Sequence, residues 1–136
     1  MAGQVANVAY TSTTYIEEVA DALDDKVGFF VGLGTTADEN SIALAADNDD
    51  TIGVMMGKLQ DGQGIKAPCE VALIDGGGIV RVKAGGTIAK GAGVQWGTGG
   101  KGVTAVLGTN DTLGVAQEAA VLDDLFPVLL SRATPA

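Results

Sequence analysis

The sequence predicts an all-β, mainly β fold: a small β-barrel or sandwich of two pseudo-repeated β-units. Three observations predict it. Short apolar runs recur at a spacing of roughly 8–12 residues, as they do in sandwiches and barrels. Glycine makes up 21 of the 136 residues, and many of these glycines lie in the turns between the runs. Only 4% of the residues are aromatic, so the predicted core is built from Val, Ile, Leu and Ala.

The predicted strands follow one another along residues 26–131, which form the predicted barrel domain. Residues 79–83 alternate apolar and charged side chains, the period-2 pattern of a strand with one buried face. Clusters of Gly, Asp and Asn separate the runs and predict turns. The strands are expected at residues 27–33, 41–45, 51–58, 65–74, 79–83, 93–97, 103–107, 112–117 and 125–130.

Both ends of the chain differ from this pattern. Residues 1–25 are predicted as an extended N-terminal arm with at most one short helix. Thr14 and Glu17 have the spacing of a capping box, and apolar side chains at helical spacing follow from Ile16 to Leu23, which predicts a helix over residues 15–23. Residues 132–136 are predicted to be a disordered tail.

A short sequence repeat divides the domain into two units. Asp-Thr-Ile-Gly-Val at residues 50–54 recurs as Asp-Thr-Leu-Gly-Val at residues 111–115. Each copy follows a comparable apolar strand and precedes another. Gly53 and Gly114 lie inside predicted strands, where a glycine indicates a bulge or a close approach of the backbone.

Composition and charge narrow the function classes. The chain has no histidine and one cysteine, Cys69, which excludes an imidazole-based triad, a His-bound zinc and an internal disulfide. The net charge of −9 comes from residues 1–50. An acidic chain is repelled by nucleic acid and by anionic membranes, so neither is an expected partner. We identify no secretory signal and no membrane-spanning run.

Several short motifs match known binding or catalytic sites, but their flanking residues do not fit those sites. Residues 97–102 match G-x-G-x-x-G, but a strand follows where a dinucleotide site needs a helix, so we predict a hairpin turn. Residues 47–50 resemble a calcium loop only in their acidity, and we interpret them as an acidic turn. Cys69 is interpreted as a buried apolar residue, and Trp96 as part of the core. The sequence therefore predicts no enzyme activity, no cofactor and no metal.

Four ordered segments carry a resemblance to a known family. They are Val-Ala-Leu-Ile-Asp-Gly-Gly-Gly-Ile-Val-Arg-Val-Lys-Ala at 71–84, Gly-Thr-Ile-Ala-Lys-Gly-Ala-Gly-Val-Gln-Trp at 86–96, Gly-Val-Thr-Ala at 102–105, and Asp-Thr-Leu-Gly-Val-Ala-Gln-Glu-Ala-Ala at 111–120. Together they resemble the capsid decoration (cement) proteins of tailed bacteriophages. With the first-half strands, the resemblance covers residues 26–131.

The resemblance implies a non-enzymatic protein that binds the outer surface of the mature head and stabilises the lattice of the major capsid protein. It implies partners in the major capsid protein and in further copies of the chain, as a homotrimer or, alternatively, a dimer. The chain would be made in the host cytoplasm and located in the virion. The alternative function is a small β-barrel ligand-binding or carrier module of a bacterial cell. For a carrier, Met-Met-Gly-Lys at residues 55–58 is similar to the Met-Lys-Met turn of biotin and lipoyl carriers, although Lys58 is expected at the end of a strand rather than at the tip of a hairpin.

The N-terminal arm supplies the candidate contact residues. No charged side chain occurs before Glu17, and a solvated tail usually carries more charge. An arm that docks on the capsid or on a neighbouring subunit would use apolar and aromatic anchors. The candidates for capsid or inter-subunit contact are Val5, Val8, Tyr10, Tyr15 and Ile16. The alternative is that these side chains pack on their own barrel.

Overall fold

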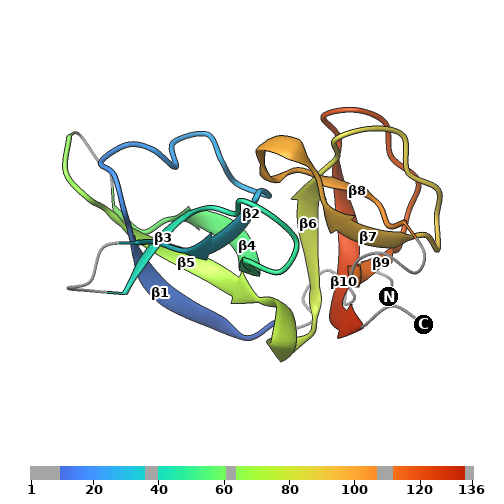
Figure 1. The fold of residues 1–136 in the computed structure, drawn as a ribbon, viewed down its shortest axis with the longest axis horizontal. Coiled ribbons are helices and arrows are strands. Elements are labelled where there is room, and N and C mark those ends of the chain that lie inside the picture. Colours follow the sequence, from blue (N-terminus) through green and yellow to red (C-terminus); the bar gives the residue numbers. More distant parts are fainter. Residues whose placement is uncertain (1–9, 36–39, 61–63, 107–111, 134–136) are drawn as a thin grey trace, which may run out of the picture.

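The computed structural model describes residues 10–35, 40–60, 64–106 and 112–133. Within these ranges the chain forms ten β-strands in two groups of five, which lie side by side with β6 at their junction (Figure 1). No α-helix occurs in the described ranges, where two short 3-10 turns, η2 (Ile74–Gly76) and η3 (Thr98–Gly100), are the helical elements. The mainly β fold predicted from the sequence is confirmed.

The first unit is a closed five-stranded barrel with the strand order β1-β3-β2-β4-β5. Its strands are β1 (Ser12–Glu17), β2 (Phe30–Leu33), β3 (Ser41–Leu44), β4 (Thr51–Lys58) and β5 (Pro68–Leu73). Neighbouring strands pair antiparallel, except that β1 and β3 close the barrel in parallel, with Ile16 opposite Ser41. Closure leaves this sheet without a free edge.

The second unit repeats the first, strand for strand. It contains β6 (Ile79–Lys83), β7 (Gly93–Trp96), β8 (Gly102–Thr104), β9 (Thr112–Ala116) and β10 (Leu125–Ala133), in the order β6-β10-β9-β7-β8. A parallel bridge between Ala84 and Gly102 joins its two edge strands, at the place that the β1–β3 pairing occupies in the first unit. The two pseudo-repeated units predicted from the sequence are therefore present.

The repeated glycines mark close approaches between strands. A Cβ atom on Gly53 in β4 would lie closer than 3.0 Å to the backbone oxygen of Ala72 in β5. A Cβ atom on Gly114 in β9 would lie 2.6 Å from the backbone oxygen of Leu129 in β10. The close backbone approach predicted from the sequence is confirmed at both positions.

One apolar cluster spans both units. It combines buried side chains of the first barrel with buried side chains of the second sheet, including Phe30, Val54, Ala72, Val82, Val94 and Phe126. A second cluster fills the first barrel and contains Leu23, Val31, Ile42, Met55, Cys69 and Val71. The Arg132 guanidinium at the end of β10 also donates a hydrogen bond to the carbonyl of Thr51 in β4. Shared packing therefore joins the units.

The predicted helix over residues 15–23 is wrong. Residues 12–17 form β1, which lies between β3 and β5, and the following residues form turns in which Asp21 and Asp25 have φ of 63° and 59°. Glu17 does not close a capping box, because its carboxylate accepts the backbone N–H groups of Asp21, Leu23 and Ala67 instead. The physical reason is that β1 completes the backbone hydrogen bonding of the barrel, which outweighs a weak local helical pattern.

The predicted boundaries at the two ends also shift. The barrel begins at Ser12 rather than after residue 25, and β1 and Leu23 belong to the barrel rather than to an arm. At the other end, β10 continues to Ala133, so Arg132 and Ala133, predicted in the tail, belong to a strand. Residues 134–136 lie outside the described ranges. Between β7 and β8, residues 97–102 form the predicted hairpin turn.

Candidate functional site

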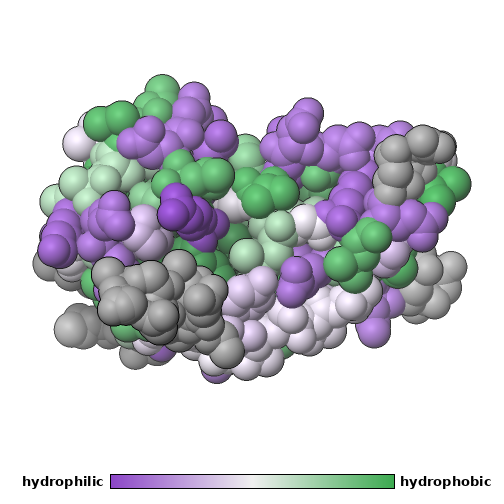
Figure 2. Space-filling model, turned by 180° about the vertical axis from the view of Figure 1, so that it is seen from behind, coloured by the Kyte–Doolittle hydropathy of each residue, from purple (hydrophilic) through white to green (hydrophobic). Residues whose placement is uncertain are grey.

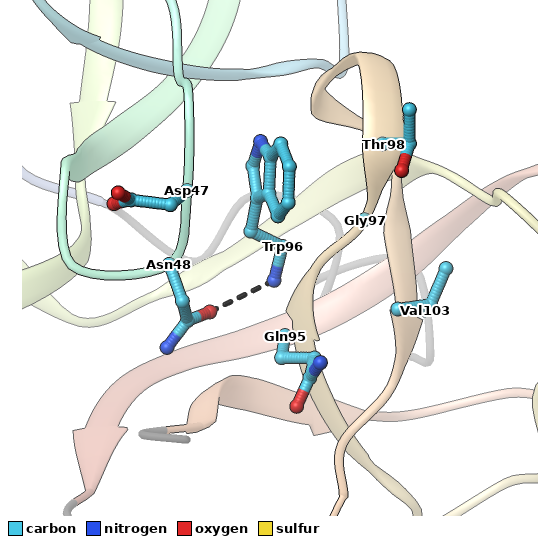
Figure 3. Close-up of a pocket in the computed structure, with 7 residues that line it drawn as sticks. All are labelled: Asp47, Asn48, Gln95, Trp96, Gly97, Thr98 and Val103. Atoms are coloured by element: carbon cyan, nitrogen blue, oxygen red, sulfur yellow. Dashed lines mark hydrogen bonds between the residues drawn. The ribbon is translucent and has the colours of Figure 1, made fainter. Parts of the chain in front are cut away.

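Trp96 lies at a pocket of about 410 Å³ between the two units. Figure 3 shows its indole between the β3–β4 loop, which carries Asp47 and Asn48, and the β7–β8 hairpin. The backbone N–H of Trp96 donates to Asn48 Oδ1 at 2.8 Å, and the indole Nε1–H donates to the carbonyl of Ala45, also at 2.8 Å. Trp96 therefore connects a loop of the first unit to a strand of the second.

The polar groups around this pocket are used within the fold. Asp47 Oδ1 accepts the backbone N–H of Asp50 at 2.7 Å, which is the acidic turn predicted from the sequence. Gln95 Oε1 accepts the backbone N–H of Val106 at 3.0 Å. Asp47 is the one acidic residue among the described residues that line the pocket, and no Lys, Arg or Cys is among them. The described ranges contain no group of three or more His, Cys, Asp or Glu side chains placed to hold a metal.

A second recess of about 530 Å³, here called the inter-unit groove, lies where β6 and β10 meet the first barrel. Its lining is mostly apolar and includes Tyr10, Val27, Met56, Ile79, Leu125 and Pro127, with Arg81, Gln117 and Glu118 as its polar members. Val27 and Leu125 are 46% and 42% exposed. Figure 2 shows that, on the face opposite to Figure 1, hydrophobic residues also reach the surface where the two units meet.

A partly buried ionic network connects the end of β4 with β1 and the turn that follows it. Lys58 Nζ at the end of β4 lies 3.2 Å from Glu17 Oε2 and 3.6 Å from an Asp21 oxygen, and it also contacts Asp24. Glu17 further accepts the backbone N–H groups of Asp21, Ala67 and Leu23 at 2.9, 3.0 and 3.4 Å. These contacts hold the turn after β1 in place, with Leu23 inserted into the barrel core.

The network shifts the pKa values of its members in favour of the charged forms. Burial alone would raise the pKa of Glu17, but the backbone donors, Ala67 first, and the Lys58 ammonium outweigh it and lower that pKa. Burial would lower the pKa of Lys58, but the carboxylates of Asp24 and Glu17 raise it. Lys58 is thus a buried structural cation, and no hairpin tip presents it as a carrier lysine would be presented.

The described contact candidates pack within the chain itself. The Tyr10 hydroxyl donates to Glu70 Oε2 at 3.4 Å, and the ring packs on the shared core cluster. Tyr15 packs on the cluster inside the first barrel, and Ile16 is a half-buried residue of β1. Tyr10 and Tyr15 therefore pack on their own chain, as the alternative expected, whereas Val5 and Val8 lie outside the described residues. An additional role in intermolecular contact stays a prediction.

One loop presents aliphatic side chains on a well-anchored backbone. Val121 and Leu122, between β9 and β10, are 57% and 59% exposed. The next two residues form hydrogen bonds with Ala84. The backbone N–H of Asp123 donates to the carbonyl of Ala84 at 2.8 Å, and the backbone N–H of Ala84 donates to the carbonyl of Asp124 at 2.7 Å. The Asp123 carboxylate also lies 2.7 Å from Lys101 Nζ. Loops are usually more mobile than strands, but the contacts with Ala84 and Lys101 restrain the backbone of this one.

Sequence reasoning missed the inter-unit groove and the Val121–Leu122 loop. One signal for the groove was present: the last strand is apolar at successive positions, from Leu125 to Leu130. A strand that buries one face alternates, whereas a run apolar on both faces indicates that the second face is also covered. The exposed loop pair had no comparable signal, because its anchoring depends on Ala84, far away in the sequence.

Comparison with known proteins identifies a solved structure with a similar fold. No family model and no curated protein matches the sequence. Among solved structures, the chain is similar to the N base of head fiber gp8.5 in bacteriophage phi29, with 16% sequence identity and a TM-score of 0.62. The likeness covers 93% of this chain and 99% of that chain. The two proteins therefore share the fold over nearly their whole lengths. The described residues include no helix that is both long and apolar enough to span a membrane.

Proposed function

We propose that this chain is a non-enzymatic structural protein of a tailed-bacteriophage head, which binds the outer surface of the mature head and stabilises the lattice of the major capsid protein. The observation that carries the proposal is the fold shared with the N base of a phage head fiber protein over 93% of the chain. The resemblance of residues 26–131 to capsid decoration proteins supports it independently, because it rests on sequence motifs.

The architecture suits this role physically. A shared core holds the two units together, so little conformational entropy is lost when the protein binds. A ligand that binds only the expanded lattice stabilises that lattice by mass action. The protein then acts by binding alone, without chemistry.

We propose the Val121–Leu122 loop as the capsid contact. Both side chains are more than half exposed, and the anchored backbone orders them before binding. Burying them would contribute about 1.5–3 kcal/mol each, before the costs of association. Exposed apolar side chains that lie next to each other on the surface are candidates for an interaction site.

Cosedimentation tests the function. The purified protein is mixed with expanded heads and with unexpanded proheads of the encoding phage, and the bound fraction is measured after centrifugation. We expect saturable binding to expanded heads, weak or no binding to proheads, and a higher temperature of head disruption when the protein is bound. Failure to sediment with expanded heads at micromolar concentrations would contradict the proposal.

Paired variants test the contact surface separately. The double substitution Val121→Asp with Leu122→Asp is expected to weaken head binding at least tenfold. The control is Val19→Asp, at a 60% exposed position of the first unit, which should bind as the unchanged protein does. If the double variant binds normally, the function stands and the contact lies elsewhere.

We also propose that the chain self-associates as a homotrimer, with a dimer as the alternative, as the decoration-protein resemblance implies. Light scattering in solution should then give three times, or twice, the 13.6 kDa chain mass. A mass equal to one chain across the micromolar range would exclude both forms in solution.

A further inference from the structure

The Lys58 amine lies among carboxylates without a hydrogen bond to any of them. Its Nζ atom lies 3.2 Å from Glu17 Oε2 and 3.6 Å from an Asp21 oxygen, and it also contacts an oxygen of Asp24. Among the described residues, no acceptor meets this buried nitrogen at hydrogen-bond geometry. Buried polar groups almost always form hydrogen bonds. A buried nitrogen that contacts carboxyl oxygens without being aligned with them therefore indicates another chemical relation between these groups.

The carboxylates of Glu17 and Asp24 differ in burial and in their surroundings. The Glu17 side chain is fully buried and accepts three backbone N–H groups, whereas 53% of the Asp24 side chain is exposed. The Asp24 N–H donates to the Asp21 carbonyl at 3.3 Å, within the turn that places Asp24 beside Lys58. Groups that are held in contact react as if they were at very high concentration. The buried carboxylate is placed to carry a proton, and the exposed one is open to solvent, into which a small product can leave.

We propose that Lys58 and Asp24 form an intramolecular isopeptide bond, with Glu17 as the proton carrier. The Lys58 ammonium passes one proton to Glu17, and the neutral Nζ attacks Cγ of Asp24. The Nζ–Cγ bond forms, and the bond from Cγ to one carboxyl oxygen breaks. That oxygen leaves as water with the proton returned by Glu17 and a second proton from Nζ. One ammonium and one carboxylate thus become one amide and one water, no other reactant is needed, and Glu17 ends in its starting state.

The ion pair described above is the reactant of this step. Because the neighbouring carboxylates raise the pKa of Lys58, the neutral amine is a minor species, and we expect the bond to form slowly after folding. The amide keeps one N–H, for which the Glu17 carboxylate is the nearby acceptor. The bond closes a loop that contains β2, β3 and β4, and closing a loop removes conformational freedom from the unfolded chain. The inference is independent of the proposed head binding.

Intact-mass measurement in denaturant tests the inference on the full-length protein. After a day at neutral pH, we expect a mass lower than that of the sequence by one water molecule. Trypsin does not cleave after a lysine whose amine is acylated. The digest should therefore contain one branched peptide that joins residues 1–26 to residues 27–66, in which Lys58 is linked to Asp24.

Three variants separate the roles. Asp24→Ala removes the acceptor carboxyl at an exposed side chain and should keep the full mass of its sequence. Glu17→Gln removes the proton carrier and should also keep its full mass, with the folded state checked by circular dichroism. The control is Asp25→Asn, which removes the adjacent carboxylate and suits the φ of 59° at that position. That variant should lose one water molecule as the unchanged protein does.

Several outcomes would overturn the inference. An unchanged protein that keeps its full sequence mass contains no such bond. Loss of water without the branched peptide points to dehydration elsewhere, for example at Asp75-Gly76, and excludes the link. A branch from Lys58 to Asp21 would show that Asp24 is not the acceptor. If Glu17→Gln loses water as fast as the unchanged protein, Glu17 does not carry the proton. If Glu17→Gln does not fold, the masses of Asp24→Ala and Asp25→Asn decide whether the bond exists.

Discussion

Replacing Gly53 or Gly114 with alanine should destabilise the protein although it adds a single methyl group. At either position the new Cβ would lie closer than 3.0 Å to a backbone carbonyl oxygen of the adjacent strand, that of Ala72 or Leu129. Neither oxygen can move without shifting β5 or β10. Overpacking of this kind costs about 1–3 kcal/mol, and we expect the upper half of that range because backbone atoms are involved.

Equilibrium unfolding in urea measures this cost. With a slope of about 2 kcal/mol per molar urea, a loss of about 2 kcal/mol lowers the midpoint by about 1 M. The control is Gly86→Ala, because a Cβ there meets nothing within 4 Å. That variant should be neutral or more stable by about 0.4–1 kcal/mol, through the lower entropy of the unfolded chain. If Gly53→Ala and Gly114→Ala unfold within 0.5 M of Gly86→Ala, the close approach is not a constraint on the fold.

Three further predictions concern buried groups. Lys58→Met should cost about 3 kcal/mol at pH 7, because it leaves the Glu17 carboxylate buried without its cation. The folded state lowers the pKa of Glu17. The stabilisation by its carboxylate is therefore present at neutral pH and is lost as the pH falls through that lowered pKa. At pH 3 the free energies of unfolding of the Lys58→Met variant and the unchanged protein should differ less than at pH 7. Cys69 is fully buried and burial raises its pKa; its reaction with a thiol reagent should be about a hundredfold slower in the native than in the urea-unfolded protein, and equal rates would contradict its placement. Trp96→Phe removes the indole donor to the Ala45 carbonyl and should cost about 1–2 kcal/mol in thermal or urea unfolding, whereas an unchanged midpoint would show that this bond does not stabilise the junction.

Most strands could be predicted from local patterns. The ranges 51–58 and 79–83 match β4 and β6 at both ends, since alternation and the adjacent turn residues lie in the same few residues. The repeat around Gly53 and Gly114 also predicted two pseudo-repeated β-units, which the structure contains as a closed barrel and a separate five-stranded sheet rather than as halves of one barrel. The strand β1 could not be predicted in this way, because Thr14 and Glu17 fit a helix start as well as they fit a strand. What decided between them was pairing with β3 and β5, which lie 25 to 60 residues away in the register.

The candidate site depended still more on distant contacts. Trp96 was expected in the core, and it does pack on it. Its two hydrogen bonds, however, join residues 48 and 51 positions apart. The sequence likewise shows the acidic residues of the turn after β1, but nothing local pairs them with Lys58 at the end of β4.

The sequence by itself determined that the chain folds as two similar β-units, because apolar periodicity and glycine turns act over a few residues and hold wherever the strands pair. The tertiary structure alone decided how those units close and meet. β1 completes the first barrel, Ala84 and Gly102 bridge the edges of the second sheet, and one shared cluster joins the two units. The physical reason is that a strand carries the same local pattern with any partner, whereas closure, the inter-unit groove and the anchored Val121–Leu122 loop arise from contacts between segments far apart in the chain.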